Sequence, residues 1–295
     1  MLTRRTFCLS AVSSGAMLAL SRSARAGEVS GAALEAEIAN IEKTSGGRLG
    51  VAVLDTSTGA RSGYRSNELF PMCSTFKLLA SAAILKRVDS GQERLDRRIS
   101  FGVSDLVVNS PTTKARVGEA GLTLAELCES AMVMSDNTAG NLLLANLGGP
   151  AGLTAFARSL GDQTTRLDRI EPELNEALPG DPRDTTSPAA MLENIRRLVL
   201  GDALLPASRQ QLTLWLLGNK TGDTRLRARL PSGWRVGDKT GIGERGTTND
   251  VGLLWPPHGD PVIVAAYLTG SPASTEQRNA MIAAVGEAVA KTLRS

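Results

Sequence analysis

A serine and a lysine, Ser74 and Lys77, lie three residues apart in a segment whose pattern predicts a helix. Residues at this separation share one face of a helix, so the hydroxyl and the amine come within reach of each other. A serine hydroxyl alone is a poor nucleophile, but a desolvated lysine of lowered pKa can accept its proton. A helix N-terminus also favours the negative charge that develops beside the serine. The pair therefore indicates nucleophilic catalysis, although Ser-x-x-Lys also occurs by chance on many exposed helices.

A second polar cluster, Ser135-Asp136-Asn137, stands immediately before an apolar run that predicts a helix. Serine, aspartate and asparagine are preferred helix N-caps, so a purely structural interpretation accounts for the cluster. In a catalytic interpretation, Ser135 relays a proton to a leaving nitrogen and Asn137 hydrogen-bonds a substrate amide. Both interpretations remain open when the cluster is considered by itself.

The third cluster is Lys239-Thr240-Gly241, in a strand-like segment bounded by glycines. A solvated edge strand would explain it. If the cluster is functional, Lys239 and Thr240 face a cleft, and Gly241 lets a substrate lie against the backbone.

The composition excludes several other chemistries. The sequence has 295 residues but a single histidine, His258, which sits beside prolines and a glycine in a predicted surface turn. A zinc hydrolase or a Ser-His-Asp enzyme needs at least one well-placed histidine, so we expect no metal and no cofactor. Aromatic residues make up 3% of the chain, which offers little material for stacking nucleic-acid bases. The proton carriers of a hydrolase here would be lysines and carboxylates.

Residues 1–26 have the pattern of a cleavable export signal, with paired arginines, an apolar stretch to Leu20 and small residues before a cleavage point after Ala26. The start Thr3-Arg-Arg-Thr-Phe7 resembles a twin-arginine signal, and the Sec route is the alternative. The apolar stretch is too short for a membrane anchor. Cleavage would remove four of the 33 basic residues and leave 29 against 30 acidic ones, a net charge of −1. We therefore expect a periplasmic protein with no nucleic-acid partner and no membrane attachment after cleavage.

The elements that must position the three clusters follow from the periodicity of apolar residues. Residues 29–44 predict a helix, and residues 48–65 predict two strands joined by a turn. The signals are helical from about residue 75 to 200, and three strand-like segments and a helix over residues 274–293 follow. Because neither strand group alone can cover its faces, the two groups should meet in one sheet. The expected fold is therefore α/β of the α+β type: an antiparallel sheet of N- and C-terminal strands flanked by helices, with an inserted all-helical lobe and a site in the cleft between them.

Three such clusters, in this order along the chain, are typical of class A β-lactamases and penicillin-binding proteins, and the sequence resembles that superfamily. One further segment distinguishes class A β-lactamases from penicillin-binding proteins. It runs from Arg169 to Asn175, is followed by residues 181–186, and resembles the Ω-loop of the class A enzymes. In that family the first glutamate and the asparagine of the loop hold the hydrolytic water, which the resemblance assigns to Glu171 and Asn175. Arg169 and Asp184 match the pair that ties the two ends of the loop together.

The resemblance implies an acyl-enzyme mechanism for hydrolysis of penicillins and cephalosporins. Ser74 attacks the lactam carbonyl, and either Lys77 directly or Glu171 through water accepts its proton. The backbone N–H groups of Ser74 and Ile242 bind the oxyanion, and Ser135 with Lys239 passes a proton to the ring nitrogen. Water activated by Glu171 then clears the ester.

The sequence also departs from the family pattern at several positions. Many members bind the substrate carboxylate with an arginine where this chain has Thr248, and others use an upstream arginine, which here matches Arg225. Asn109 stands where the family often has an aromatic residue. Cys73 and Cys128 match cysteines of two family disulfides whose partner positions are occupied here by other residues, so two free, buried thiols are expected.

The sequence thus predicts a signal peptide over 1–26, a discontinuous α/β domain over 27–66 and 217–295, and a helical domain over 67–216 that includes an Ω-loop at 166–184. The expected partner is a small-molecule β-lactam, and the expected oligomeric state is a monomer. A D-Ala-D-Ala peptidase and a penicillin-sensing domain are the competing interpretations. The presence of Glu171 and Asn175 argues against the first, and the lack of membrane segments in this sequence argues against the second.

Overall fold

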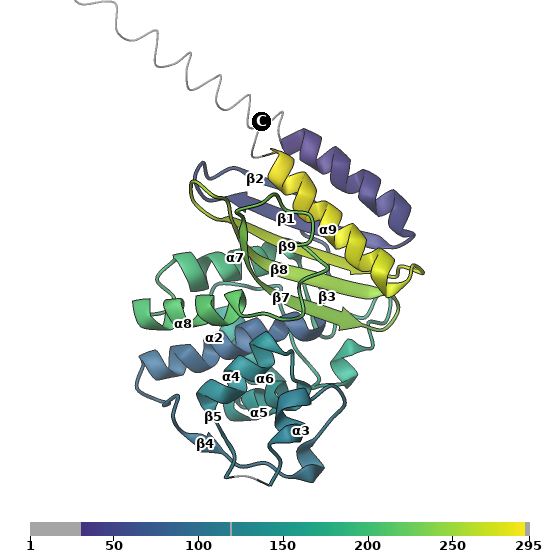
Figure 1. The fold of residues 1–295 in the computed structure, drawn as a ribbon. Helices are drawn as coiled ribbons and strands as arrows, with labels where there is room; N and C mark the ends of the chain where they lie inside the picture. The colour runs from purple at the N-terminus through teal and green to yellow at the C-terminus, as the bar shows by residue number, and fades with distance from the viewer. Residues whose placement is uncertain (1–30, 119, 293–295) are drawn as a thin grey trace, which may run out of the picture.

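Five antiparallel strands form the central sheet, in the order β2-β1-β9-β8-β7. The computed structural model describes residues 31–118 and 120–292 (Figure 1). Strands β1 (Arg48–Asp55) and β2 (Arg61–Tyr64) come from the N-terminal part, and β7 (Arg235–Gly243), β8 (Thr247–Trp255) and β9 (Val262–Thr269) from the C-terminal part. All eight residues of β1 pair with β9. The predicted meeting of the two strand groups in one antiparallel sheet is confirmed.

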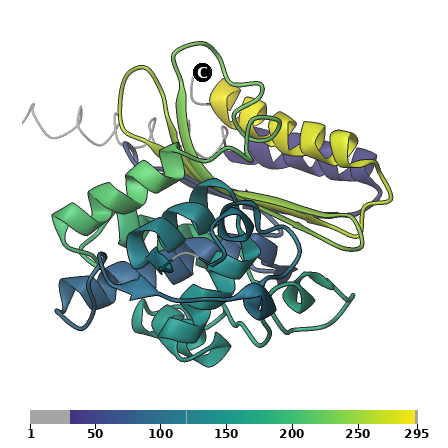
Figure 2. The same cartoon turned by 60° about the horizontal axis from the view of Figure 1, so that its bottom comes forward.

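Helices cover both faces of this sheet. The helix of residues 31–45 and α9 (Thr275–Thr292) lie side by side on one face, as both views show (Figures 1 and 2). Helices α7 (Pro188–Ile195) and α8 (Pro206–Leu217) pack against the other face. Successive side chains of a strand point to opposite faces, so Val51 joins the apolar core under α9 while Ala52 joins the core on the helical side. Burial on both sides explains why β1 and β9 are almost continuously apolar.

The helical block between the two strand groups is built around α2 (Phe76–Asp89), which packs against α4, α5, α6 and α8. All side chains of α2 from Phe76 to Leu85 are buried. The other elements of this block are short helices and strand pairs: β3 (Phe70–Pro71), η1 (Cys73–Thr75), β4 (Arg98–Ile99), η2 (Val103–Asp105), α3 (Pro111–Ala115), β5 (Leu122–Thr123), α4 (Leu124–Val133), α5 (Asn137–Leu147), α6 (Pro150–Ser159), η3 (Glu173–Asn175), β6 (Thr185–Thr186) and η4 (Arg196–Leu200). The block is helical with only short extended pieces, as the sequence predicts.

The predicted signal segment, residues 1–26, lies outside the described residues. Within residues 31–118 and 120–292, no helix is long and apolar enough to cross a membrane.

Candidate active site

Ser74 lies in η1, the short turn that leads directly into α2. Lys77, in the first turn of α2, donates a hydrogen bond of 2.9 Å from Nζ to Ser74 Oγ. The Lys77 side chain is completely buried, and this burial lowers the pKa of its amine. A lysine of lowered pKa in contact with a serine hydroxyl is the arrangement that can remove the hydroxyl proton.

Glu171 contacts both the Ser74 hydroxyl and the Lys77 amine. Ser74 Oγ donates to Glu171 Oε1 at 3.0 Å, and Lys77 Nζ lies 3.1 Å from that oxygen. Asn175 Nδ2 donates to the other carboxylate oxygen, Oε2. The structure therefore brings four of the predicted site residues into one buried hydrogen-bonded chain.

Ser135 connects this chain to the edge of the sheet. Lys239 Nζ donates to Ser135 Oγ at 3.0 Å, and Lys77 Nζ lies 3.5 Å from the same oxygen. Burial, followed by the charge of Lys77, holds the pKa of Lys239 well below its usual value. The Ser135 hydroxyl thus stands between two buried amines, either of which can exchange a proton with it.

The Ser-Asp-Asn cluster contains a helix cap and a side chain that contacts Lys77. Asp136 is the N-cap of α5 and accepts a hydrogen bond from the Ala139 N–H at 2.8 Å. Asn137 Oδ1 accepts from Lys77 Nζ at 2.6 Å, so its side chain also belongs to the site. Asn109 borders this group, since its Nδ2 donates to the Ser135 carbonyl oxygen at 3.4 Å.

Strand β7 forms the sheet edge beside Ser74 and carries the third cluster. Thr240 Oγ1 shares a hydrogen bond with Thr221 Oγ1, and Ile242 is 45% exposed. Packing also requires glycine at position 241, while its predicted role beside a substrate stays a prediction. A Cβ there would stand 2.9 Å from the Met72 carbonyl oxygen, so Gly241 allows the chain before the nucleophile to approach β7.

Arg225 lies close to this strand, in the segment between α8 and β7. Its Nη1 donates to the carbonyl oxygens of Gly241 (2.9 Å) and Asn249 (2.7 Å), and its Nε donates to Asn279 Oδ1 at 3.0 Å. The side chain is buried, which lowers the pKa of the guanidinium. None of these partners is a carboxylate, so within the described residues Arg225 forms no ion pair.

The two ends of the predicted Ω-loop are joined by the pair that the sequence indicates. Arg169 Nε donates to Asp184 Oδ2 at 2.6 Å, and Asp184 Oδ1 accepts the backbone N–H groups of Asp168 and Arg169. Asp184 is 1% exposed. This buried junction fixes the segment that carries Glu171 and Asn175.

Sequence reasoning missed two contributors to the site. Asn141 clamps the backbone of Glu171, since its Oδ1 accepts the Glu171 N–H at 2.9 Å and its Nδ2 donates to the Glu171 carbonyl oxygen at 2.8 Å. Asn141 lies one helical turn after Asn137, and that spacing could have revealed it. Thr221, the partner of Thr240, carries no comparable signal.

Both described cysteines, Cys73 and Cys128, are free and buried, as predicted. Burial raises the pKa of the Cys128 thiol to about 12. Position 243 faces the Cys73 sulfur, since a Cβ there would stand 2.6 Å from it. Because this position is a glycine, it offers Cys73 no thiol for a disulfide. No group of three or more His, Cys, Asp or Glu side chains within the described ranges could hold a metal ion.

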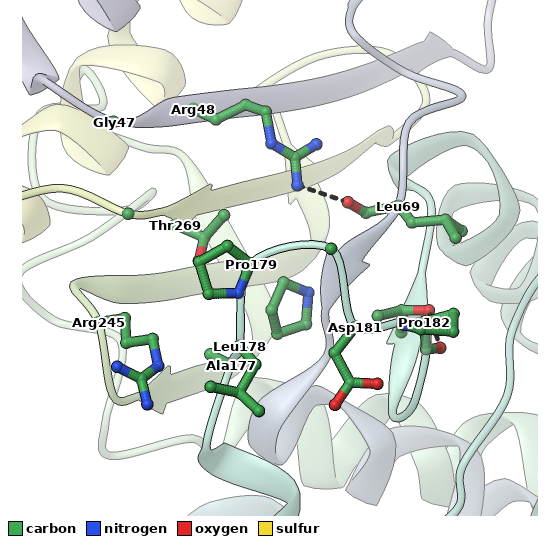
Figure 3. A pocket seen from close by; sticks show the side chains of 14 residues that line it. Gly47, Arg48, Leu69, Ala177, Leu178, Pro179, Asp181, Pro182, Arg245 and Thr269 are labelled. Atoms are coloured by element: carbon green, nitrogen blue, oxygen red, sulfur yellow. Dashed lines mark hydrogen bonds between the residues drawn. The ribbon is translucent and has the colours of Figure 1, made fainter.

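A separate cavity of about 340 Å³ lies between the second half of the Ω-loop and the ends of the sheet strands (Figure 3). The loop residues Ala177 to Pro182 form one wall, and Arg48 and Arg245 belong to the other. Arg48 is anchored by a bond from Nη2 to the Leu69 carbonyl oxygen. None of the predicted catalytic side chains lines this cavity.

The comparisons with known proteins agree with this geometry. Residues 33–293 match the model of the β-lactamase enzyme family. β-Lactamase OXY-1 of Klebsiella oxytoca is 48% identical over 88% of this chain and 89% of its own length. β-Lactamase Toho-1 of Escherichia coli is 48% identical over 87% and 88% of the two chains.

The chain belongs to the class A β-lactamase family. Two solved structures of class A β-lactamases have a TM-score of 0.86 against it and cover 88% of its length and 99% of their own. One, an ancestral Gram-negative enzyme, is 64% identical, and the other, described as a putative class A β-lactamase PenP from Rhodopseudomonas palustris, is 62% identical. This class A β-lactamase is accordingly a serine hydrolase that opens the β-lactam amide bond through an acyl-enzyme, an activity that confers antibiotic resistance.

Proposed function

We propose that Ser74 is the nucleophile of this enzyme and that Glu171 activates the water that clears the acyl group. The observation that carries this assignment is the contact of one hydroxyl with two candidate bases, Lys77 Nζ at 2.9 Å and Glu171 Oε1 at 3.0 Å. Hydrogen-bond contact between nucleophile and base is the geometric requirement for activating a serine. Because both bases make it, acylation is assigned to Lys77 directly or to Glu171 through water.

In the acylation step, the Ser74 oxygen forms a bond to the lactam carbonyl carbon as its proton passes to the base. The oxyanion is held by the N–H groups of Ser74 and Ile242; losing one such donor raises a barrier by roughly 3–4 kcal/mol. The C–N bond of the ring then breaks, and the nitrogen takes a proton from Ser135. The contacts of Ser135 Oγ with Lys239 and Lys77 support this relay, since either amine can restore the Ser135 proton.

In the deacylation step, a water molecule beside Glu171 and Asn175 gives a proton to the Glu171 carboxylate and attacks the ester. The short contact of Asn175 Nδ2 with Glu171 Oε2 and the clamp of Asn141 on the Glu171 backbone support this role, because both fix the direction of the carboxylate. Ser74 leaves with the proton and the free enzyme is restored.

Substrate recognition is assigned to residues around the same group. Arg225, with Thr240 and Ser135, binds the substrate carboxylate, while Asn137 hydrogen-bonds the side-chain amide. Gly241 and Ile242 present backbone groups at the sheet edge, and Asn109 borders the site. Because Asn109 offers no aromatic ring for stacking, we assign penicillins and early cephalosporins as the substrates.

The remaining assignments concern the whole chain. Residues 1–26 direct export to the periplasm by the twin-arginine route, and the mature enzyme acts as a monomer without cofactor, nucleic acid or membrane attachment. Residues 27–66 and 217–295 form the α/β domain, and residues 67–216 form the helical domain with the Ω-loop at 166–184. The apolar core under α9 contains only residues of 27–66 and 217–295, which supports this division. The core around α2 also takes in sheet residues such as Ala52 and Leu253, so the two domains share it.

The test is a time course of ring opening by purified mature protein with an excess of a chromogenic cephalosporin. Turnover continuing far beyond one equivalent is expected, because Glu171 and its water remove each acyl group. A burst of one equivalent that then stops would contradict the deacylation role and indicate a penicillin-binding protein or sensor. A D-Ala-D-Ala peptide serves as the matched control substrate, and it should not be hydrolysed.

A further inference from the structure

Two buried carboxyl groups lie behind the Lys-Thr-Gly strand. Asp238 on β7 and Asp250 on β8 both have 0% exposure. Asp238 pairs in register with Gly252, and Thr240 pairs with Asp250, so the two aspartates share one face of the sheet as diagonal neighbours. Lys239 points to the opposite face, toward Ser135. The aspartates therefore lie on the α9 side, away from Ser74.

Each of these carboxyl groups has one oxygen with conventional donors and one without. Asp238 Oδ1 accepts from Asn219 Nδ2 at 3.0 Å and from Arg227 Nη2, and Asp250 Oδ2 accepts from the Leu226 N–H at 3.1 Å. Asp238 Oδ2 and Asp250 Oδ1 are both buried without such a donor. These two oxygens belong to diagonal neighbours on one face of the sheet, so a proton on one carboxyl group would give both oxygens a partner.

An ionised carboxylate can only accept hydrogen bonds, so a bond between two carboxyl groups requires one proton. Asp238 already forms an ion pair with the Arg227 guanidinium. Asp250 accepts one backbone hydrogen bond and forms no ion pair within the described residues. Burial, followed by the charge of Asp238, holds the pKa of Asp250 well above its usual value. The proton accordingly belongs on Asp250.

The state of Asp250 matters for Arg225, its neighbour. Arg225 donates to two carbonyl oxygens and one amide oxygen, and the charges of Asp250 and Asp238 favour its ionised form. An ionised Asp250 would offset the guanidinium charge at short range. A neutral Asp250 leaves that charge available.

We infer that Asp250 is a neutral carboxylic acid that donates its proton to Asp238 Oδ2 and thereby keeps the charge of Arg225 available for the substrate carboxylate. Asp250 is then a positioning residue, because it acts through Arg225 and touches no reacting atom. This inference rests on the proposed role of Arg225 in substrate binding. The charged groups on this side of the sheet are Asp238 of β7, Arg225 and Arg227 of the preceding segment, and Arg278 of α9, which donates to Thr248 Oγ1. Lys239 of β7 lies on the other face.

The proton can be observed directly by infrared spectroscopy at neutral pH, where ordinary carboxyl groups are ionised. The mature Glu171→Gln protein, which lacks the other buried carboxyl of the site, should still show the C=O stretching band of a protonated carboxylic acid. Adding Asp250→Asn should remove that band. If the Glu171→Gln protein shows no such band, Asp250 is ionised and the inference is wrong; this outcome does not depend on whether the Asp250→Asn variant folds.

Kinetics test the consequence for Arg225. Asparagine has the charge of a neutral aspartic acid, so Asp250→Asn should leave KM for a penicillin unchanged at neutral pH. As pH rises and Asp250 of the wild-type enzyme ionises, the KM of the wild type should increase while that of Asp250→Asn does not follow. A KM that falls about tenfold in Asp250→Asn at neutral pH would mean that an ionised Asp250 had opposed binding, and would overturn the inference.

The proposed roles of Arg225 and Asp250 can be tested separately. If Arg225 does not bind the carboxylate, Arg225→Ala leaves KM unchanged, but the infrared band of Asp250 persists. If Asp250 is ionised, the band is absent while Arg225→Ala still raises KM.

Discussion

At the residue scale, Lys77 is where the separate polar clusters of the sequence meet. Its buried amine donates to Ser74 of the first cluster, to the carbonyl of Ser135 and to Asn137 of the second, and lies 3.1 Å from Glu171 of the Ω-loop. A buried charge is tolerated only where it is paired and fully hydrogen-bonded. This requirement explains why residues that are distant in sequence lie together around the Lys77 amine.

Arg225 provides a prediction at this scale. Arg225→Ala should raise KM for penicillins roughly ten- to hundredfold with a smaller change in kcat, since a hydrogen bond to a charged group contributes about 1.5–3 kcal/mol. Steady-state kinetics with a penicillin measure both constants. The matched control is Arg229→Ala, an exposed arginine of the same segment that lies 3.7 Å from Glu287. Equal KM values for both variants and the wild type would exclude Arg225 from carboxylate binding.

The residues around the Ser74 hydroxyl could be predicted because they belong to short sequence motifs. Ser74, Lys77 and Glu171 each belong to a pattern whose spacing has a chemical reason. Asn141 and Asp250 belong to no such motif. Their roles depend on contacts across elements, such as the Asn141 clamp on Glu171, and these contacts appear only when the chain is folded.

At the element scale, the Ω-loop determines how firmly Glu171 is held. Within residues 166–184, the only regular element is the short turn η3. Its geometry therefore depends on the ion pair at its ends and on the contact of Asn175 with the sheet edge, where the Glu244 N–H donates to the Asn175 carbonyl oxygen at 2.9 Å.

Removing the junction should loosen the loop and slow deacylation. Asp184→Ala leaves Arg169 and two backbone N–H groups without their buried acceptor, and we expect a loss of about 3 kcal/mol of unfolding free energy. Chemical denaturation measures the stability, and kcat for a penicillin should fall at the same time. Glu173→Ala removes an exposed carboxylate from the same loop and should change neither. Similar behaviour of the two variants would refute the special role of the Asp184 junction.

Regular elements were easier to predict than the close approaches between them. The helix of residues 31–45 and the five strands of the central sheet follow from the periodicity of apolar residues. Gly241 could be recognised from the sequence, but its packing against the chain before the nucleophile could not. The Met72 carbonyl oxygen lies so close to β7 that only glycine fits there. The periodicity of apolar residues does not show how closely two elements approach each other.

At the scale of the whole molecule, the sheet separates two apolar cores, and many arginine–carboxylate pairs surround them. Three such pairs lower a carboxyl pKa to about 2: Arg97 acts on Glu93, Arg196 on Glu193 and Arg183 on Asp181. These carboxyl groups titrate in the unfolded chain near their ordinary values of about 4. The order of strands could be partly predicted from the sequence, but these pairs could not, because they depend on side-chain directions.

The paired carboxylates predict how stability depends on pH. A pKa that is lower in the folded than in the unfolded chain stabilises the fold above the unfolded value, and this stabilisation disappears as pH falls through the folded value. The melting temperature should therefore decline between about pH 4 and pH 2. Thermal unfolding followed by circular dichroism measures it. The decline should be smaller in high salt, which screens exposed pairs. A melting temperature independent of pH in this range would contradict the account.

The most direct test of the central claim is the fate of the acyl group on Ser74 when the proposed base for deacylation is removed. Mature Glu171→Gln protein is mixed with a penicillin, and the mass of the intact protein and of its Ser74 peptide is followed over time. The account predicts that the variant gains one penicillin on Ser74 and keeps it, while the wild-type enzyme returns to its original mass as it consumes the substrate. Sustained hydrolysis by Glu171→Gln at the wild-type rate, with no lasting adduct, would show that Glu171 does not activate the deacylating water.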